Sequence, residues 1–270
     1  MEARGPTLPL LIGGALLSGC ADPATSPRPP ERVPELRDDF EGEELAPFWR
    51  PGDHGTGRYA PGAVVLTDER ARWGRRAARI TLREGDVAQR GDSGQENERA
   101  ELDSGRHLLV EGEAWVGWSF LLPEGFPVAD VRLVLAQWKQ SELEGSPLIA
   151  QRLRAGRHTL TVRDWRRRGG PLLELELPPI VPGRWHDMLW HAHFGRGADG
   201  HFEAWLDGES VARHAGPLIG PGGADTLYHK VGLYRDRWPE PMTLYVDGYA
   251  LGAARAHVDP ALRGVDWDAR

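Results

Sequence analysis

The chain has 270 residues, 33 basic against 40 acidic side chains, and a formal net charge of −7. This mild acidity argues against general nucleic-acid binding, and no basic helix or RNA-binding motif accompanies the dispersed arginines. The only cysteine is Cys20, so no disulfide can form within the chain and the fold must depend on its hydrophobic core.

The N-terminal segment indicates export and lipid attachment. Residues 8–17 are mostly apolar but too few to span a bilayer, and the sequence Leu-Ser-Gly-Cys ending at Cys20 resembles the lipobox of bacterial lipoproteins. In such proteins the leader is cut just before the cysteine, which then carries the lipid. We therefore predict a signal peptide over 1–20, lipidation at Cys20, and a flexible tether over 21–35.

This leader predicts a location in the bacterial cell envelope. The lipid on Cys20 would anchor the protein to a membrane, either the outer membrane or one facing the periplasm. The alternative is a plain secretory signal with a stray cysteine, which would give a secreted protein.

The rest of the chain, 36–270, is typical of a β-protein, because short apolar runs alternate with turns rich in its 34 glycines and 22 prolines. No helical period persists and no internal repeat is visible. The pattern predicts two packed antiparallel sheets forming one jelly-roll domain. The strands expected in chain order are 38–42, 63–67, 77–82, 98–102, 115–122, 131–139, 148–153, 158–162, 172–177, 184–194, 201–206, 211–214, 228–235 and 242–248.

The strand expected over 228–235 has two different faces. Its residues alternate, so Val231 and Leu233 would face the core while Lys230 and Tyr234 would face outward. Four residues of strand separate the lysine from the phenol, which is roughly 13 Å. The pattern therefore predicts a cation and a phenol on one accessible face, unless these are ordinary surface polar groups.

Tyr234 is a candidate for proton transfer, because positive charge from Lys230 and Arg235 would favour a phenolate. Gly232 lies between the lysine and the phenol, and we expect it to leave space for a flat ligand against the sheet.

Two further strands would bring polar pairs to an open face. Arg99 and Glu101 share a face of one strand, and the alternative to a functional role is a cross-strand ion pair. Gln137 and Lys139 share a face of another, with Trp138 on the opposite side, where we expect it in the core.

These blocks together resemble one family, the jelly-roll polysaccharide lyases, especially heparin lyase I and glucuronan lyase and more distantly the alginate lyases. The alginate lyases carry Arg-x-Glu-Leu, Gln-x-His and Tyr-x-Lys-x-Gly-x-Tyr blocks, and the last is complete here. The resemblance spans roughly 38–250 and implies a concanavalin A-like, all-β sandwich. The blocks in order are Arg99-Ala100-Glu101-Leu102, residues 118–123, Gln137-Trp138-Lys139, residues 183–186 and residues 228–235.

The resemblance implies cleavage of a uronic-acid glycan by β-elimination, with no required cofactor. Arg99 and Gln137 would bind the uronate carboxylate, and Tyr234 would act as base, as acid, or as both in turn. The chain departs from the family at Lys139, where a histidine is common. A lysine could replace the charge of that histidine, but it could act as a base only with a strongly lowered pKa.

The remaining expectations follow from the same resemblance. We expect a monomer that binds an anionic polysaccharide, in which Lys230, Arg235, Glu101, His54 and His229 contact the substrate. Glu41 on the first strand and Asp247 on the last are the candidates for a structural calcium site, with ordinary surface acids as the equal alternative.

Two other functions remain open. A non-catalytic carbohydrate-binding module could share this fold. A related glycoside hydrolase would need closely spaced carboxylates on one strand face, typically Glu-x-Asp-x-x-Glu, but Glu174 and Glu176 lack the third acid. His186, His191 and His193 suggest zinc, although the sequence provides no nearby ligand to complete such a site.

Overall fold

The computed structural model describes residues 1, 33, 35–51, 59–86, 89–90, 96–105, 108–109 and 111–265. The chain divides into two units, Met1–Glu31 and Arg32–Arg270, and nearly every described residue belongs to the second. The lipobox, including Cys20, lies outside the described residues. No described helix is long and apolar enough to cross a membrane.

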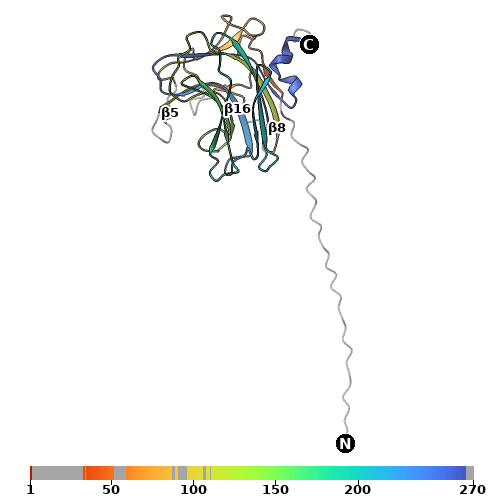
Figure 1. The fold of residues 1–270 in the computed structure, drawn as a ribbon. Coiled ribbons are helices and arrows are strands. Elements are labelled where there is room, and N and C mark those ends of the chain that lie inside the picture. The colour runs from red at the N-terminus through yellow and green to blue at the C-terminus, as the bar shows by residue number, and fades with distance from the viewer. Residues whose placement is uncertain are drawn as a thin grey trace. The chain divides into compact units, whose positions relative to one another are not determined.

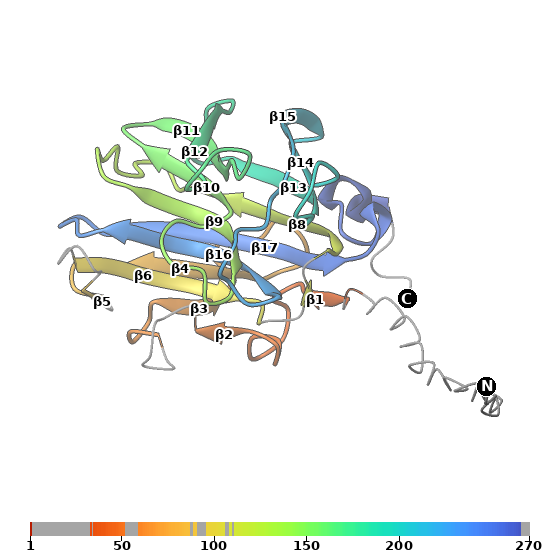
Figure 2. The same ribbon diagram turned by 90° about the horizontal axis from the view of Figure 1, so that it is seen from below.

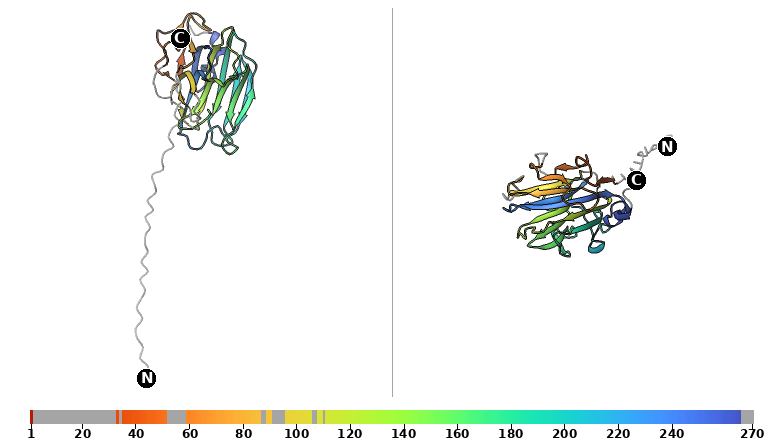
Figure 3. Two further views of the ribbon diagram at one scale, coloured as in Figure 1. Left: turned by 90° about the vertical axis from the view of Figure 1, so that its left-hand side faces the viewer. Right: turned by 90° about the horizontal axis from the view of Figure 1, so that it is seen from above.

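The second unit contains two antiparallel sheets, as the sequence pattern predicts. Figures 2 and 3 show the strands of both sheets running in similar directions, the arrangement of an aligned sandwich. The eight-stranded sheet has the order β15 (Glu209–Ala215), β14 (His201–Leu206), β13 (Trp185–His193), β8 (Glu113–Leu121), β17 (Met242–Gly252), β4 (Ala77–Leu82) and β3 (Val64–Thr67), with β1 (Leu36–Asp38) also paired to β17.

The nine-stranded sheet contains most of the polar residues singled out above. Its order is β12 (Leu172–Glu176), β11 (Arg157–Arg163), β10 (Ile149–Arg154), β9 (Leu133–Gln140), β16 (Thr226–Asp236), β6 (Glu96–Asp103) and β2 (Arg50–Pro51), with β5 (Gln89–Arg90) paired to β6 and β7 (Leu108–Leu109) to β16. Side chains of β16 and of β8 in the other sheet (both labelled in Figure 1) meet in the core, where the rings of His229 and Trp118 have centroids 5.1 Å apart.

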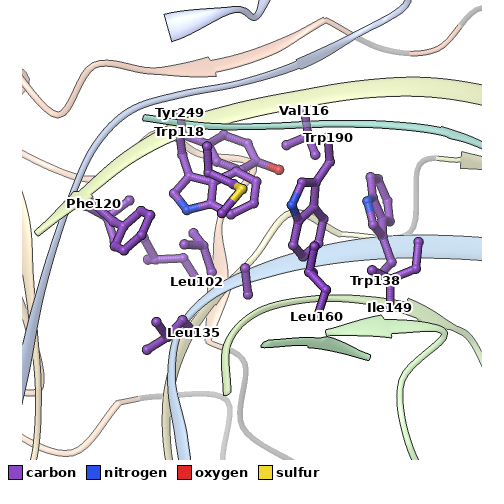
Figure 4. Close-up of a cluster of buried hydrophobic side chains, with 14 of the residues drawn as sticks. Leu102, Val116, Trp118, Phe120, Leu135, Trp138, Ile149, Leu160, Trp190 and Tyr249 are labelled. Atoms are coloured by element: carbon purple, nitrogen blue, oxygen red, sulfur yellow. The ribbon is translucent and has the colours of Figure 1, made fainter. Parts of the chain in front are cut away.

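The core lies between the two sheets and is rich in tryptophan. Trp118 of β8 and Trp190 of β13 meet edge to face, with ring centroids 5.0 Å apart, and Trp138 of β9 approaches from the other sheet (Figure 4). All three side chains are at most 1% exposed. Large aromatic rings remove much apolar area from water, which compensates for the absence of a disulfide. The expectation that Trp138 belongs to the core is confirmed.

The all-β jelly-roll prediction is confirmed, and most expected strands match the observed ones. The first strand is an exception, because β1 ends at Asp38 instead of continuing to residue 42. Phe40 adopts a positive φ of 59°, and its amide donates a 2.8 Å hydrogen bond to the Asp38 carboxylate. That local side-chain bond turns the backbone away from the sheet.

Two short 3-10 helices, η1 (Arg255–His257) and η2 (Pro260–Val265), follow the last strand, and the segment between them packs on the outside of the eight-stranded sheet. A Cβ at Gly117 of β8 would lie only 2.2 Å from the Val258 carbonyl oxygen, so glycine is required for this contact. The nine-stranded sheet has its own outward face, called here the open face.

Candidate active site on the open face of the nine-stranded sheet

The open face brings together the predicted residues of three neighbouring strands. Tyr234 of β16 lies opposite Arg99 of β6, and Lys230 of β16 lies opposite Gln137 of β9. These side chains come from positions that alternate with core residues, which is why the period-two pattern predicted their common face. Arg99, Gln137 and Tyr234 therefore share one side of the sandwich.

Glu101 lies at the centre of this group and is only 1% exposed. Its Oε2 atom lies 3.2 Å from Arg99 Nε and 3.9 Å from Lys230 Nζ, while its Oε1 accepts a hydrogen bond from Gln137 Nε2. The ion pair between Arg99 and Glu101 joins positions i and i+2 of one strand, so it is not the cross-strand pair that was the alternative to a functional role. A buried carboxylate with three donors fixes the positions of Arg99 and Gln137 on the open face.

Lys230 is also buried, with 4% of the residue exposed, and its Nζ lies 3.6 Å from Asp103 Oδ2. Burial lowers the pKa of Lys230, and the nearby Glu101 and Asp103 carboxylates oppose that shift. Glu101 and Asp103 together with Lys230 and Arg99 make two acids and two cations, so this part of the site is close to charge-balanced.

Tyr234 is half-buried and lies against two guanidinium groups. The Cζ atom of Arg99 is 4.0 Å from the centre of the phenol ring, and that of Arg132 is 4.6 Å from it. Arg132 is fixed in turn by Asp236 Oδ1 at 2.6 Å and Asn97 Oδ1 at 2.7 Å. The two cations hold the ring in place and supply positive charge beside its hydroxyl.

A bulge in β16 sets the position of Tyr234. Between Val231 and Tyr234 the pairing with β9 skips a residue, while the pairing with β6 continues without interruption. Gly232 within the bulge has a φ of 145°, and a Cβ there would lie 2.4 Å from the Ala100 carbonyl oxygen. The glycine is therefore needed for close backbone approach, and the expected open space for a flat ligand was wrong.

Lys139 occupies the position at which the family often has histidine. Its Nζ donates to the carbonyl oxygens of Gly145, at 3.1 Å, and Leu143, at 3.4 Å. Burial lowers its pKa to about 8, and the nearby charges of Lys230 and Arg99 add to that effect. A lysine with this pKa is partly neutral near pH 8, so it meets the condition on which a role as base depends.

Two predicted substrate contacts lie on the wrong side of β16. Arg235 is 0% exposed, and its guanidinium donates to Glu98 Oε2 at 2.7 Å and to the Glu240 and Trp238 carbonyl oxygens. This side chain is fully engaged inside the protein, so its predicted contact with a glycan was wrong.

His229 is likewise 0% exposed and lies among the core tryptophans Trp118, Trp138 and Trp190 (labelled in Figure 4). Burial lowers the pKa of its imidazole to about 3, so the ring is neutral at physiological pH. Its proposed substrate contact was wrong for the same geometric reason. His54 lies outside the described residues.

The two candidate calcium ligands bind the same loop, away from the open face. Glu41 Oε1 accepts the amides of Arg75 and Arg76 at 2.7 Å each, and Asp247 Oδ2 accepts those of Arg72 and Trp73. Among the described residues, the buried Oδ1 atom of Asp247 has no hydrogen-bond partner. Burial raises the pKa of Asp247 to about 7, and the charge of Glu41 contributes to the increase. An oxygen-seeking cation on Oδ1 fits these observations.

The fold brings two carboxylates that were not predicted as ligands, Glu111 and Asp199, beside His193. His193 Nε2 lies 3.1 Å from Asp199 Oδ2, and the ligand atoms of His193, Asp199 and Glu111 all lie within 4.8 Å of one another. His186 is instead held by Asp207 and the Val181 amide. Partly exposed acids of this kind often occur without a metal.

Several positively charged open-face residues were not predicted. Arg132, Arg152 and Arg163 add positive charge around Tyr234 and Lys139. Arg152 alternates with core residues of its strand, so the same period-two pattern could have identified it.

The comparisons with known proteins agree with this geometry. Residues 40–250 match the family model described as polysaccharide lyase, which is well over half of the chain. No curated protein matches the chain.

Several solved structures share the fold. An endo-β-1,4-glucuronan lyase from the fungus Trichoderma reesei matches with a TM-score of 0.59 and 18% identity, over 79% of this chain and 98% of that one. A cellulose-induced protein matches at 0.53 and 12% identity, over 81% and 97%, and an alginate lyase of polysaccharide lyase family 7 at 0.51 and 14%, over 76% and 94%. Identities this low show only the shared fold. By the family match, the chain belongs to the polysaccharide lyase family.

Proposed function

We propose that this lyase cleaves a uronic-acid-containing glycan, of the glucuronan, heparin or alginate type, by β-elimination. The observation that carries the proposal is the convergence of Arg99, Gln137 and Tyr234 on one open face, with a buried Glu101 orienting the first two. These are the donor and proton-transfer groups that the reaction requires.

The first task is to neutralise the carboxylate of the uronate. A carboxylate at C6 makes the proton on C5 more acidic once its negative charge is balanced by positive charge or hydrogen-bond donors. Arg99 and Gln137 are the groups proposed to bind it, because guanidinium and amide groups both donate to carboxylate oxygens. Lys139 supplies further positive charge when protonated.

The second task is to move two protons. A base removes the C5 proton, the C–H electron pair forms the C4–C5 double bond, and the bond from C4 to the glycosidic oxygen breaks. The departing oxygen then takes a proton from an acid. Tyr234 is the proposed base and acid, because its phenol shares the open face with Arg99 and Gln137 and lies against the Arg99 and Arg132 guanidiniums.

One observation favours the alternative, a carbohydrate-binding module without catalysis. Gln137 is only 3% exposed and already donates to Glu101, so it must change its bonding to reach a substrate. A module that only binds would not need that rearrangement.

A direct assay separates the two functions. A lyase leaves an unsaturated sugar end that absorbs ultraviolet light, so incubation with a panel of uronate polysaccharides should give rising absorbance. Mass spectrometry of the products should show no added water, which distinguishes elimination from hydrolysis. Binding without a rise in absorbance on any polymer would support the module instead.

Two further proposals concern location and metal. We propose that Cys20 carries a lipid anchor in the cell envelope and that the folded unit acts as a monomer. The expected measurement is detergent-phase partitioning that Cys20→Ala abolishes. We also propose that Asp247 and Glu41 contribute ligands to a structural calcium ion remote from the open face.

A further inference from the structure

Most of the guanidinium groups on the open face near Tyr234 are paired with acids. Arg99 is bound to Glu101, and Arg132 is bound to Asp236. Such pairs are close to charge-balanced and need no ligand to satisfy them. Arg152 of β10 differs from both.

Arg152 faces the open side because its strand neighbours Ile149 and Leu153 pack into the core. Its Nε atom donates a 2.8 Å hydrogen bond to Thr161 Oγ1 on β11, which fixes the direction of the guanidinium. Within the described part of the chain, no carboxylate lies within ion-pairing distance of Arg152. The group is half-buried, so its positive charge is partly desolvated and still accessible.

The charge environment of Arg152 also favours an incoming anion. Burial lowers its pKa to about 10, and repulsion from Arg132 adds to that shift. A guanidinium in this state gains more from an anionic partner than one that is already paired with an acid or fully hydrated.

A second positively charged side chain with few hydrogen-bond partners among the described residues lies nearby on the same face. Arg163 of β11 has a buried Nε atom without a hydrogen-bond partner among the described residues, and its Nη2 reaches only the Glu144 carbonyl oxygen, at 3.4 Å. Its charge also lowers the pKa of Lys139. Positive side chains therefore extend from Lys139 of β9 across Arg152 of β10 to Arg163 of β11, with none of the three in an ion pair with an acid among the described residues.

The sheet register gives the distance from the proposed reaction centre. Tyr234 pairs with Val134 of β9, and Val134 pairs with Arg152. Two strand spacings are about 10 Å. This separation refers to the backbone positions of Tyr234 and Arg152. A polysaccharide crossing the strands could therefore place one sugar at Tyr234 and a neighbouring sugar at Arg152.

We propose that Arg152, oriented by Thr161, binds the carboxylate of a uronate next to or near the one that is cleaved. The protein then prefers polymers with uronates at successive positions over polymers in which only the cleaved sugar is acidic. This inference rests on the proposed lyase function for its substrate class, but the binding itself can be measured without catalysis.

The test compares Arg152→Gln with Arg154→Gln, both in a Tyr234→Phe background so that no oligosaccharide is consumed. Arg154 is a suitable control because it lies on the same strand, is exposed, and is paired with Asp130 at 2.7 Å. Calorimetry would measure binding of a β-1,4-linked glucuronate hexasaccharide, an alginate hexasaccharide and a carboxyl-reduced, neutral hexasaccharide. Thermal unfolding would verify that each variant is folded.

We expect Arg152→Gln to weaken binding of at least one acidic hexasaccharide by tenfold or more, and to leave the neutral one unchanged. Arg154→Gln should change the affinities for the acidic and the neutral hexasaccharides by less than twofold. Arg152→Lys should retain part of the affinity for the acidic hexasaccharides. Unchanged affinity in a folded Arg152→Gln protein, or an equal loss for the neutral sugar, would overturn the inference.

The same set of experiments separates this inference from the lyase proposal. If no polymer is cleaved but Arg152→Gln still weakens acidic binding, the subsite stands and the elimination mechanism fails. If polymers are cleaved with the KM and kcat of Arg152→Gln unchanged, the lyase stands and the subsite fails.

Discussion

The guanidinium of Arg99 lies over the phenol ring of Tyr234, with its Cζ atom 4.0 Å from the ring centre, while its Nε contacts Glu101. One arginine thus links a buried acid to the residue proposed to transfer protons. In the proposed function, this one side chain would couple carboxylate binding to proton transfer.

Replacing Tyr234 with phenylalanine should abolish turnover and preserve the fold. The ring and its contacts with Arg99 and Arg132 remain, but the proton-transfer group is lost, so we expect kcat to fall by on the order of 10²- to 10⁴-fold. The measurement is the initial rate of ultraviolet absorbance on the best polymer.

Tyr245→Phe is the matched control, because Tyr245 lies on β17 of the eight-stranded sheet, where its hydroxyl donates to Glu69. It should retain nearly full activity. Equal rates for Tyr234→Phe and the native protein would reject Tyr234 as the proton-transfer residue.

Lys139 should make substrate affinity depend on pH. Its ammonium is charged below a pKa of about 8 and neutral above it, so attraction for a polyuronate should decrease as the pH rises through 8. We expect KM to increase severalfold between pH 7 and 9.

Lys139→Arg keeps its charge over this range and should remove most of that pH dependence. A comparison of KM against pH for the two proteins measures the effect. If kcat instead rises through pH 8 and Lys139→Arg loses turnover, neutral Lys139 is acting as the base.

Asp247 should make stability decrease with rising pH in the absence of a bound cation. The folded-state pKa is about 7, above the ordinary value of 3.8, so the folded protein binds a proton more tightly than the unfolded chain does. Between about pH 4 and 7 the unfolding free energy contributed by this group declines, and above pH 7 it stays at its minimum.

Calcium bound at Oδ1 would reverse that loss, because the cation favours the ionised carboxylate. We expect millimolar calcium to raise the Tm of the native protein at pH 8 by several degrees, and to have little effect on Asp247→Asn. Asp130→Asn, at an exposed site, should respond like the native protein. Equal calcium responses in all three proteins would exclude Asp247 as a ligand.

Arg235→Met should destabilise the protein instead of weakening substrate binding. The substitution leaves the Glu98 carboxylate buried without its ion pair, which costs roughly 3–5 kcal/mol. Urea unfolding measures the loss, and KM should change little in the protein that remains folded.

Arg237→Met offers the comparison, since Arg237 pairs with Glu84 at an exposed position. The free energy of unfolding should change by no more than about 1 kcal/mol in this variant. If the Arg235→Met protein were instead stable and had a raised KM, the prediction that Arg235 contacts the substrate would be supported again.

The strands of both sheets were largely predictable because alternation records which side of each strand is buried. The same alternation contained the answer for His229 and Arg235, which share odd positions with Val231 and Leu233 in β16. These two residues were predicted to contact the substrate because of their side-chain chemistry, although their positions in the alternation place them on the buried face of β16. The correct burial was therefore available from the sequence.

Other features depend on contacts that alternation does not encode. The early end of β1 follows from the bonds of Asp38 to the Phe40 amide and the Trp49 indole. The bulge at Gly232 exists because β16 has one residue more than β9 between two successive paired positions. Arg132 lies in the connection that leads into β9, whereas Tyr234 lies on β16. No spacing of residues in the sequence therefore predicts their contact.

The bulge at Gly232 also affects how this site could be redesigned. Pairing with β6 is continuous from Lys230 to Asp236, so Arg99 and Tyr234 move as one block, whereas the offset toward β9 arises from a single additional backbone unit. Swapping β9 for a relative's segment would leave the phenol and the guanidinium aligned and affect only Gln137 and Lys139, the two site residues on that strand. Substrate preference could then be altered by exchanging one strand without rebuilding the proton-transfer apparatus.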